Sequence, residues 1–294
     1  MKTALNILLG IVLLIIVLSF ILVYANTHPP RYPLNIPPSD YHREYENVTF
    51  VTKDGLTLAG WLIKPDRTGK NMPSIIICHG LGANRSDFTD LAVFLAQRGY
   101  LVLMFDFRAH GDSEGSRTSL GYHEQKDVNA ALQYLSMRPE VDQGRIGIFG
   151  FSLGGSTAIL AAAETRKFRA VVADSAFTSL KDQARQAITE YYHLPAFPFV
   201  AFSVLTYELY FQTKVNNIDP ESVIGVIAPA PVLIIAGEGD DMIPAGNGRR
   251  LYQAAGEPKE LWIIPVGSHG GTVAAAGHEY HMRVGAFFDR YLKP

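Results

Sequence analysis

The stretch GIFGFSLGGSTAILAAAE, residues 147–164, places Ser152 between an apolar run and an Ala-rich run. The residues before the serine are typical of a buried strand, and those after it favour a helix. Gly150 and Gly154 have no Cβ, so the chain can turn tightly from one element to the other. Such a G-x-S-x-G turn presents the serine hydroxyl as a nucleophile. The alternative is a Gly/Ser turn that only caps the helix.

Size and composition indicate a globular protein. The chain has 294 residues, 48% of them hydrophobic, which suffices for one large α/β domain. A formal charge of −2 argues against a nucleic-acid-binding surface. Cys78 is the only cysteine, so an intramolecular disulfide is excluded and the redox compartment stays open.

The N-terminus carries a long apolar segment. Residues 5–25 contain no charged side chain, and at ~1.5 Å per residue a helix of this length spans a bilayer core of ~30 Å. We therefore expect residues 1–26 to form a membrane anchor. A cleaved signal sequence is the alternative, because Val23-Tyr24-Ala25 resembles a cleavage site. The few flanking charges favour a cytoplasmic N-terminus and an extracytoplasmic catalytic domain.

A Pro-rich spacer is expected after this segment, at residues 27–45, followed by one domain at residues 46–294. The spacer holds five prolines between residues 27 and 40. The domain opens with two alternating runs joined at Asp54-Gly55, a hairpin signal. Short apolar strands then alternate with helices, which predicts a mostly parallel, doubly wound α/β sheet with helices on both faces.

One region interrupts this alternation. No strand pattern is visible between residues 176 and 230, and a helical pattern there is broken by Pro195 and Pro198. We expect a helical cap at about residues 178–227, inserted after the sixth strand. The cap is rich in aromatic residues, most of which should pack it onto the domain while some line an apolar pocket: Tyr191, Tyr192, Phe197, Phe199, Phe202, Tyr207, Tyr210 and Phe211.

A nucleophilic serine needs hydrogen-bond donors for the oxyanion that forms in the reaction. In an open α/β sheet these groups gather outside the carboxyl ends of the strands. The loop His79-Gly80-Leu81-Gly82 follows one strand, so the backbone N–H of Leu81 is one expected donor. The N–H of Leu153, directly after the serine, is the second. His79 itself is expected to shape the loop.

The acid and the base that would activate Ser152 are expected at the ends of other strands. In PVLIIAGEGDDMIP, residues 231–244, Asp240 is favoured over Asp241, and Asp174 is a further alternative. Asp106 is expected to brace the site. Only three histidines follow Asp240, and His269 lies between a strand and two glycines, where its ring can reach another strand end.

His278 and His281, the other two, begin the last helix and are expected to face outward. Their spacing lacks the H-E-x-x-H pattern of zinc hydrolases, so we expect neither a metal nor a cofactor.

Together, the motifs GFSLGG, HGLGANRSDF, FDFRAHGDSEG, GEGDDMIP and GSHGGT resemble the α/β-hydrolase superfamily, over residues 46–294. The order Ser, Asp, His is that of the superfamily. The loop FDFRAHGDSEG, with Ala109 where many relatives have glycine, is most similar to the branch of serine aminopeptidases and monoacylglycerol lipases. The resemblance implies that Ser152 is the nucleophile, His269 the base and Asp240 the acid.

The expected function is therefore that of a membrane-anchored serine hydrolase that cleaves small-molecule carboxylic esters. A peptidase is the first alternative, with Asp182, Glu190 and Glu208 of the cap as candidates to bind a free amino terminus. A catalytically silent module of the same fold is the second. The oligomeric state is left open.

Overall fold

The computed structural model describes residues 1–66 and 69–293. Its centre is one eight-stranded sheet with the order β1-β2-β4-β3-β5-β6-β7-β8. Strand β2 pairs antiparallel with both β1 and β4, and the remaining neighbours are parallel. The strands are β1 Tyr45–Val51, β2 Thr57–Ile63, β3 Met72–Cys78, β4 Leu101–Phe105, β5 Val141–Phe151, β6 Ala170–Asp174, β7 Val232–Gly237 and β8 Lys259–Ile264.

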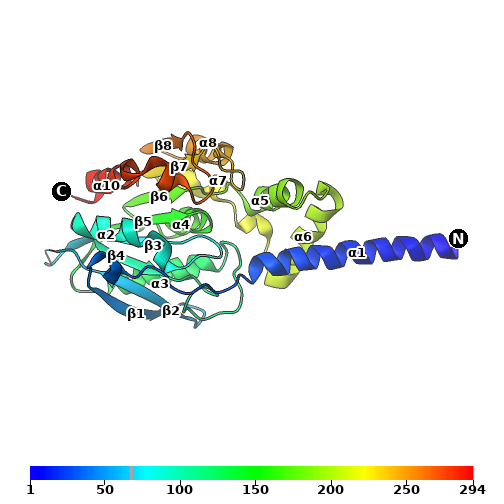
Figure 1. Ribbon diagram of the computed structural model, residues 1–294, viewed down its shortest axis with the longest axis horizontal. Coiled ribbons are helices and arrows are strands. Elements are labelled where there is room, and N and C mark those ends of the chain that lie inside the picture. Colours follow the sequence, from blue (N-terminus) through cyan, green and yellow to red (C-terminus); the bar gives the residue numbers. More distant parts are fainter. Residues whose placement is uncertain (67–68, 294) are drawn as a thin grey trace.

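Helices cover both faces of this sheet (Figure 1). One face packs against α2 (Thr89–Gln97) and α10 (His278–Leu292). The other packs against α3 (Glu124–Ser136), α4 (Leu153–Thr165) and α8 (Ala245–Ala254). The alternation of side chains along β3 supplies both cores, because Ile75 and Ile77 enter the first and Ile76 the second. The expected α/β architecture is therefore confirmed.

Some boundaries differ from the sequence pattern. The pattern of residues 120–138 predicts a helix that starts at Leu120, but α3 begins at Glu124. Its buried carboxylate accepts hydrogen bonds from Thr118 and Ser119 and from the N–H of Gly121, which holds residues 118–121 as a turn. His281 also differs, since it is half-buried and pairs with Asp90 of α2 at 3.1 Å. His278 is exposed, as expected.

No strand lies between β6 and β7 in the described chain. This stretch is helical: α5 (Leu180–Gln186), a π-helical turn (Ala187–Tyr191), α6 (Ala196–Phe211), a 3-10 turn (Val215–Asn217), α7 (Pro220–Val223) and a 3-10 turn (Ile224–Ile227). The two prolines separate α5 from α6, because Pro195 precedes α6 and the chain at Phe197 is not helical. Short elements elsewhere are two 3-10 turns (Pro38–Tyr41 and Arg85–Phe88) and α9 (Thr272–Ala276).

The apolar N-terminal segment forms the long helix α1, Lys2–Thr27, with a mean hydropathy of 3.2 in its most apolar window. It projects from the body of the molecule with the N-terminus far from the sheet (Figure 1). By length and composition, it is the one candidate membrane span among the described residues. The half of α1 nearer the domain packs along α6, through Ile15, Leu18 and Leu22.

The Pro-rich segment after α1 is extended and lies on the domain. Arg31 donates hydrogen bonds to the carbonyls of Gly111 and Ser113 at 2.6 Å and of Gly115 at 2.7 Å. Asn84 donates to the Tyr32 carbonyl at 3.2 Å. A free spacer makes no such contacts, so this segment fixes the end of α1 relative to the sheet.

Candidate active site

Ser152 lies in a strained turn between β5 and α4. Its φ of 54° and ψ of −116° are rarely adopted by a residue with a side chain. A Cβ on Gly150 would lie 2.2 Å from the carbonyl oxygen of Gly154, and a Cβ on Gly154 would lie 2.3 Å from that of Cys78. Both glycines are therefore required by space. The N–H of Ser152 donates to the Asp174 carbonyl at 2.8 Å, which ties the turn to β6.

The structure brings His269 and Asp240 next to this serine. His269, in the loop after β8, has its Nε2 3.1 Å from Ser152 Oγ and its Nδ1 2.9 Å from Asp240 Oδ2. The buried Asp240 cannot donate when ionised, so Nδ1–H donates to it and Nε2 is free to accept from the serine. The other carboxylate oxygen of Asp240 accepts from the N–H groups of Met242 and Ile243, which fixes its orientation.

The two alternative acids lie elsewhere. Asp241 is exposed at the edge of the pocket. Asp174 is fully buried and accepts hydrogen bonds from the hydroxyls of Ser175, Thr272 and Tyr280. Burial raises the pKa of Asp174 to about 6, against the opposing effect of these hydroxyls. Neither carboxylate is hydrogen-bonded to His269 within the described residues.

The two expected oxyanion donors border the same cavity as Ser152. Leu81 is partly exposed in the loop after β3, and Leu153 begins α4. Among the described residues, neither N–H donates to a protein acceptor, so both are available to a ligand. The N–H of Leu153 also belongs to the first turn of α4, where the helix dipole favours negative charge.

Two buried histidines hold the loop that carries Leu81. His79 Nε2 accepts from the N–H of Phe107 at 3.0 Å, so its Nδ1–H donates to the Gly80 carbonyl at 2.7 Å. The second histidine, His110, accepts a hydrogen bond at Nε2 from the N–H of Gly82 at 3.2 Å. Burial lowers the pKa of both histidines, which keeps them neutral in these roles. The expected shaping role of His79 agrees with this geometry.

Asp106 braces the same region from the end of β4. It forms a buried ion pair with Arg85 and accepts from the backbone N–H of Arg85 at 2.7 Å and of Asp112 at 2.9 Å. Burial raises the pKa of Asp106, and the Arg85 guanidinium opposes that effect. These contacts hold the carboxylate in place, and none of them involves Ser152.

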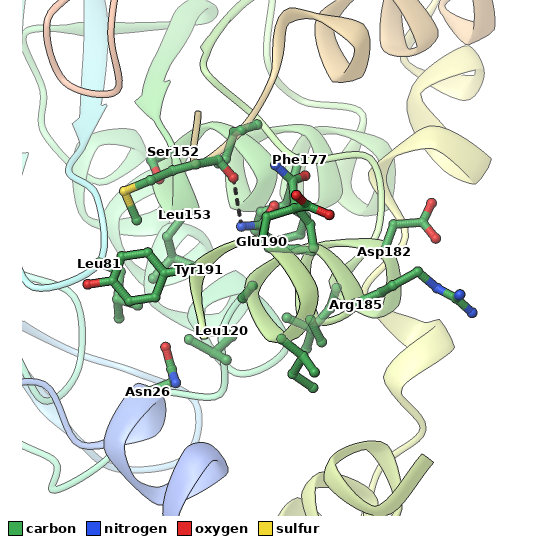
Figure 2. A pocket seen from close by; sticks show the side chains of 18 of the residues that line it. Asn26, Leu81, Leu120, Ser152, Leu153, Phe177, Asp182, Arg185, Glu190 and Tyr191 are labelled. Atoms are coloured by element: carbon green, nitrogen blue, oxygen red, sulfur yellow. Dashed lines mark hydrogen bonds between the residues drawn. The ribbon is translucent and has the colours of Figure 1, made fainter. Parts of the chain in front are cut away.

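A pocket of about 1500 Å³ opens over Ser152 and His269. Its walls are the loop 80–83, the cap residues 177–192, parts of α6 and, unexpectedly, the end of α1. Figure 2 shows Asn26 of α1, Leu81 and Tyr191 around the space that leads to Ser152. The pocket is mostly apolar, as expected of a site for small organic substrates.

The aromatic residues of the cap occupy three kinds of position. Tyr191, Tyr192 and Tyr207 line the pocket. Phe199 and Phe211 are buried in the packing of the cap, and Phe197 is 81% exposed on its outer side. Most aromatic side chains of the cap therefore pack inside it or lie on its surface. Aliphatic side chains form much of the pocket wall.

Sequence reasoning missed His110, Arg31 and the contribution of α1. His110 could have been found from the sequence, since it belongs to the polar loop that follows β4. Arg31 and α1 could not, because a lone arginine among prolines and a uniformly apolar helix do not indicate which residues they contact. Among the described residues, no three His, Cys, Asp or Glu side chains are grouped as metal ligands are.

The sheet, the strained serine turn and the adjacent histidine and aspartate define an α/β hydrolase. A family model described as X-Pro dipeptidyl-peptidase (S15 family) matches residues 54–193. Protein YfhR of Escherichia coli (strain K12) is 33% identical over 229 residues, 76% of this chain and 73% of YfhR. Protein YqkD of Bacillus subtilis (strain 168) is 31% identical over 250 residues, 84% of this chain and 80% of YqkD.

A solved structure shows the same fold. The Pyrococcus furiosus esterase Pf2001 matches with a TM-score of 0.74 at 28% sequence identity, covering 91% of this chain and 99% of that one. The chain belongs to the α/β-hydrolase superfamily, in the family that includes YfhR and YqkD.

Proposed function

We propose that this protein is a membrane-anchored serine hydrolase that cleaves carboxylic esters. The observation that carries the proposal is the continuous chain of hydrogen bonds from Ser152 Oγ through His269 to Asp240, at 3.1 and 2.9 Å. A serine hydroxyl becomes a competent nucleophile when an oriented imidazole can accept its proton.

In the proposed reaction, Ser152 Oγ attacks the ester carbonyl carbon while His269 Nε2 takes the hydroxyl proton. The carbonyl oxygen becomes an oxyanion, which the N–H groups of Leu81 and Leu153 stabilise. Asp240 stabilises the imidazolium. His269 then protonates the leaving alcohol, and an acyl-enzyme remains. A water molecule, deprotonated by His269, releases the acid and restores the serine.

Two observations favour an ester with an apolar acyl group. The pocket over Ser152 is mostly apolar, and the structurally similar Pf2001 is an esterase. Burial of each methylene contributes about 0.8 kcal/mol, or roughly a fourfold gain, so longer acyl chains should be preferred until the pocket is full. We further propose that residues 1–26 anchor the enzyme and that residues 46–294, with the cap at about 178–227, form an extracytoplasmic catalytic domain.

A peptidase is the second candidate, because the matching family model describes a dipeptidyl-peptidase. Such an enzyme needs an anion for the free amino terminus of its substrate. Glu190 and Asp241 border the pocket. Asp182 does too, but it pairs with Arg250 at 3.1 Å, and Glu208 pairs with Lys214 at 2.8 Å away from the pocket lining.

One set of measurements separates these functions. A fluorophosphonate probe should label the wild-type protein and leave folded Ser152→Ala unlabelled. A panel of p-nitrophenyl esters of increasing chain length is then compared with X-Pro p-nitroanilides. Rising kcat/KM along the ester series supports the esterase. Efficient anilide cleavage with a flat ester series would replace it by the peptidase, and absence of labelling in folded wild type would indicate a silent module.

A further inference from the structure

The end of α1 forms part of the wall of the substrate pocket. Leu22, Val23 and Asn26, on its last two turns, line the same cavity as Ser152 (Figure 2 labels Asn26). Asn26 Nδ2 donates to the Tyr192 hydroxyl of the cap at 3.1 Å. The anchor helix and the cap therefore close this side of the pocket together.

If α1 lies in a membrane, its contact with α6 determines how deeply the cap is immersed. Ile15 and Leu18 of α1 pack against Phe199 and Val200 of α6. A bilayer core needs about 20 helical residues, and every run of that length within Lys2–Thr27 includes Ile15 and Leu18. If α1 spans the bilayer, the part of α6 beside these residues lies at membrane depth.

The sequence and exposure of α6 fit that depth. Residues 196–207 contain no charged side chain. Phe197, Leu205 and Leu209 are exposed by 81%, 50% and 71%, although they are large and apolar. Lys181 and Arg185 of α5 border a shallow groove beside Phe197, where ammonium and guanidinium groups can meet lipid phosphates. A bilayer around α1 would cover Phe197, Leu205 and Leu209, which otherwise face water.

We propose that α6 is immersed in the leaflet nearest the catalytic domain, and that the substrate is a long-chain acyl ester dissolved in the bilayer. The ester enters the pocket laterally beside α1 and α6, so its acyl chain passes from lipid to an apolar wall without crossing water. This inference rests on the proposed esterase activity and membrane anchor, and it names the substrate class of that site.

The test uses the full chain in phosphatidylcholine vesicles and two substrates. Monooleoylglycerol is dissolved in the bilayer, and p-nitrophenyl acetate is supplied in water. Leu205→Glu places a carboxylate on the exposed face of α6, outside the pocket lining. The matched control is Met137→Glu, at a side chain that is 77% exposed at the end of α3.

Leu205→Glu should lower the rate on monooleoylglycerol by about tenfold or more, because a charged group resists immersion in lipid. Its rate on p-nitrophenyl acetate should stay within about twofold of wild type, and Met137→Glu should change neither rate. Phe197→Glu, at the most exposed side chain of α6, should behave like Leu205→Glu.

Equal rates of Leu205→Glu, Phe197→Glu and Met137→Glu on monooleoylglycerol would overturn the lateral entry. Wild-type hydrolysis of the acetate without hydrolysis of monooleoylglycerol would overturn the substrate class while leaving the esterase function intact. If the wild type hydrolysed neither monooleoylglycerol nor p-nitrophenyl acetate and was not labelled by the fluorophosphonate, the esterase function on which the inference depends would be overturned.

Discussion

At the scale of single residues, Ser152 combines a strained backbone with a short path to His269. The strain arises from the Cβ at a φ of 54°, which alanine shares. Ser152→Ala should therefore keep the fold while abolishing turnover, and His269→Ala should do the same because both belong to one proton-transfer unit. Asp240→Asn should lower kcat on the order of a hundredfold or more.

These variants are compared by kcat on a p-nitrophenyl ester and by thermal unfolding. His278→Ala is the control, since His278 is exposed on α10 and should remain fully active. An inactive His278→Ala beside an active His269→Ala would show that the base is assigned wrongly.

Asp174 makes the second prediction, on pH and stability. Its pKa is raised to about 6 in the folded chain, whereas an unfolded aspartic acid titrates near 3.9. The native state therefore binds this proton more tightly, and the free energy of unfolding falls by about 3 kcal/mol as pH rises from about 4 to above 6. The stabilisation that the proton on Asp174 gives the folded state is therefore fully present below about pH 4 and is lost above about pH 6.

Asp174→Asn removes this titration while retaining an oxygen that can accept from Thr272 and Tyr280. Between pH 4.5 and pH 7.5 the melting temperature of the variant should rise by about 3 °C relative to that of the wild type, because about 2 kcal/mol of the effect falls in this range. Taking differences between the two proteins cancels the titration of the other carboxylates. A wild-type–variant difference that is the same at both pH values would show that Asp174 ionises normally.

At the scale of elements, the segment after α1 is predicted to stabilise the loop 106–115. Arg31→Ala removes hydrogen bonds from one guanidinium to the carbonyls of Gly111, Ser113 and Gly115. This substitution should lower the free energy of unfolding by about 2 kcal/mol, or the melting temperature by about 3 °C, because charge-assisted hydrogen bonds are lost together. Arg31→Lys should recover only part, since an ammonium group cannot reproduce the planar fork.

The control is Arg43→Ala, because Arg43 pairs with the exposed Asp66. An exposed pair contributes at most about 1 kcal/mol, so this change should be small. Equal melting temperatures for Arg31→Ala and Arg43→Ala would mean that the segment is not held by Arg31.

The helix α1 gives the fourth prediction, on chain-length selectivity. Val23 lines the pocket, so Val23→Trp should fill space near the cap and shift the preferred p-nitrophenyl ester to a shorter acyl chain. Ala25→Trp, on the exposed side of the same turn, should leave the preference unchanged. The measurement is kcat/KM along the ester series for both full-length variants. Identical profiles would place α1 outside the substrate path.

At the scale of the whole molecule, α1 is both the proposed anchor and a wall of the pocket. The full chain should sediment with membranes and remain there after a carbonate wash, because α1 is 26 residues long and its most apolar window has a mean hydropathy of 3.2. A chain starting at residue 27 should be labelled at Ser152 but discriminate less between ester lengths, since one wall is missing. A mature N-terminus at Asn26 in the native host would instead indicate a cleaved signal sequence.

The local pattern of the chain determined much of this description. Apolar strands alternating with helices predicted the parallel sheet, and Gly150 and Gly154 predicted the tight turn at Ser152 because only glycine fits there. The candidates His269 and Asp240 followed from their places after predicted strands. Parallel strands bring their carboxyl ends to one edge of the sheet, so the order of elements alone placed these residues near each other.

Tertiary structure decided what depends on contacts between distant segments. Uniform hydrophobicity hides which face of α1 packs, so only the folded chain shows Val23 and Asn26 in the pocket. Arg31 meets backbone carbonyls 79 to 84 residues away, and carbonyls are present in every residue and leave no trace in a sequence. Burial likewise set the pKa of Asp174, because desolvation depends on what surrounds a group rather than on its neighbours along the chain.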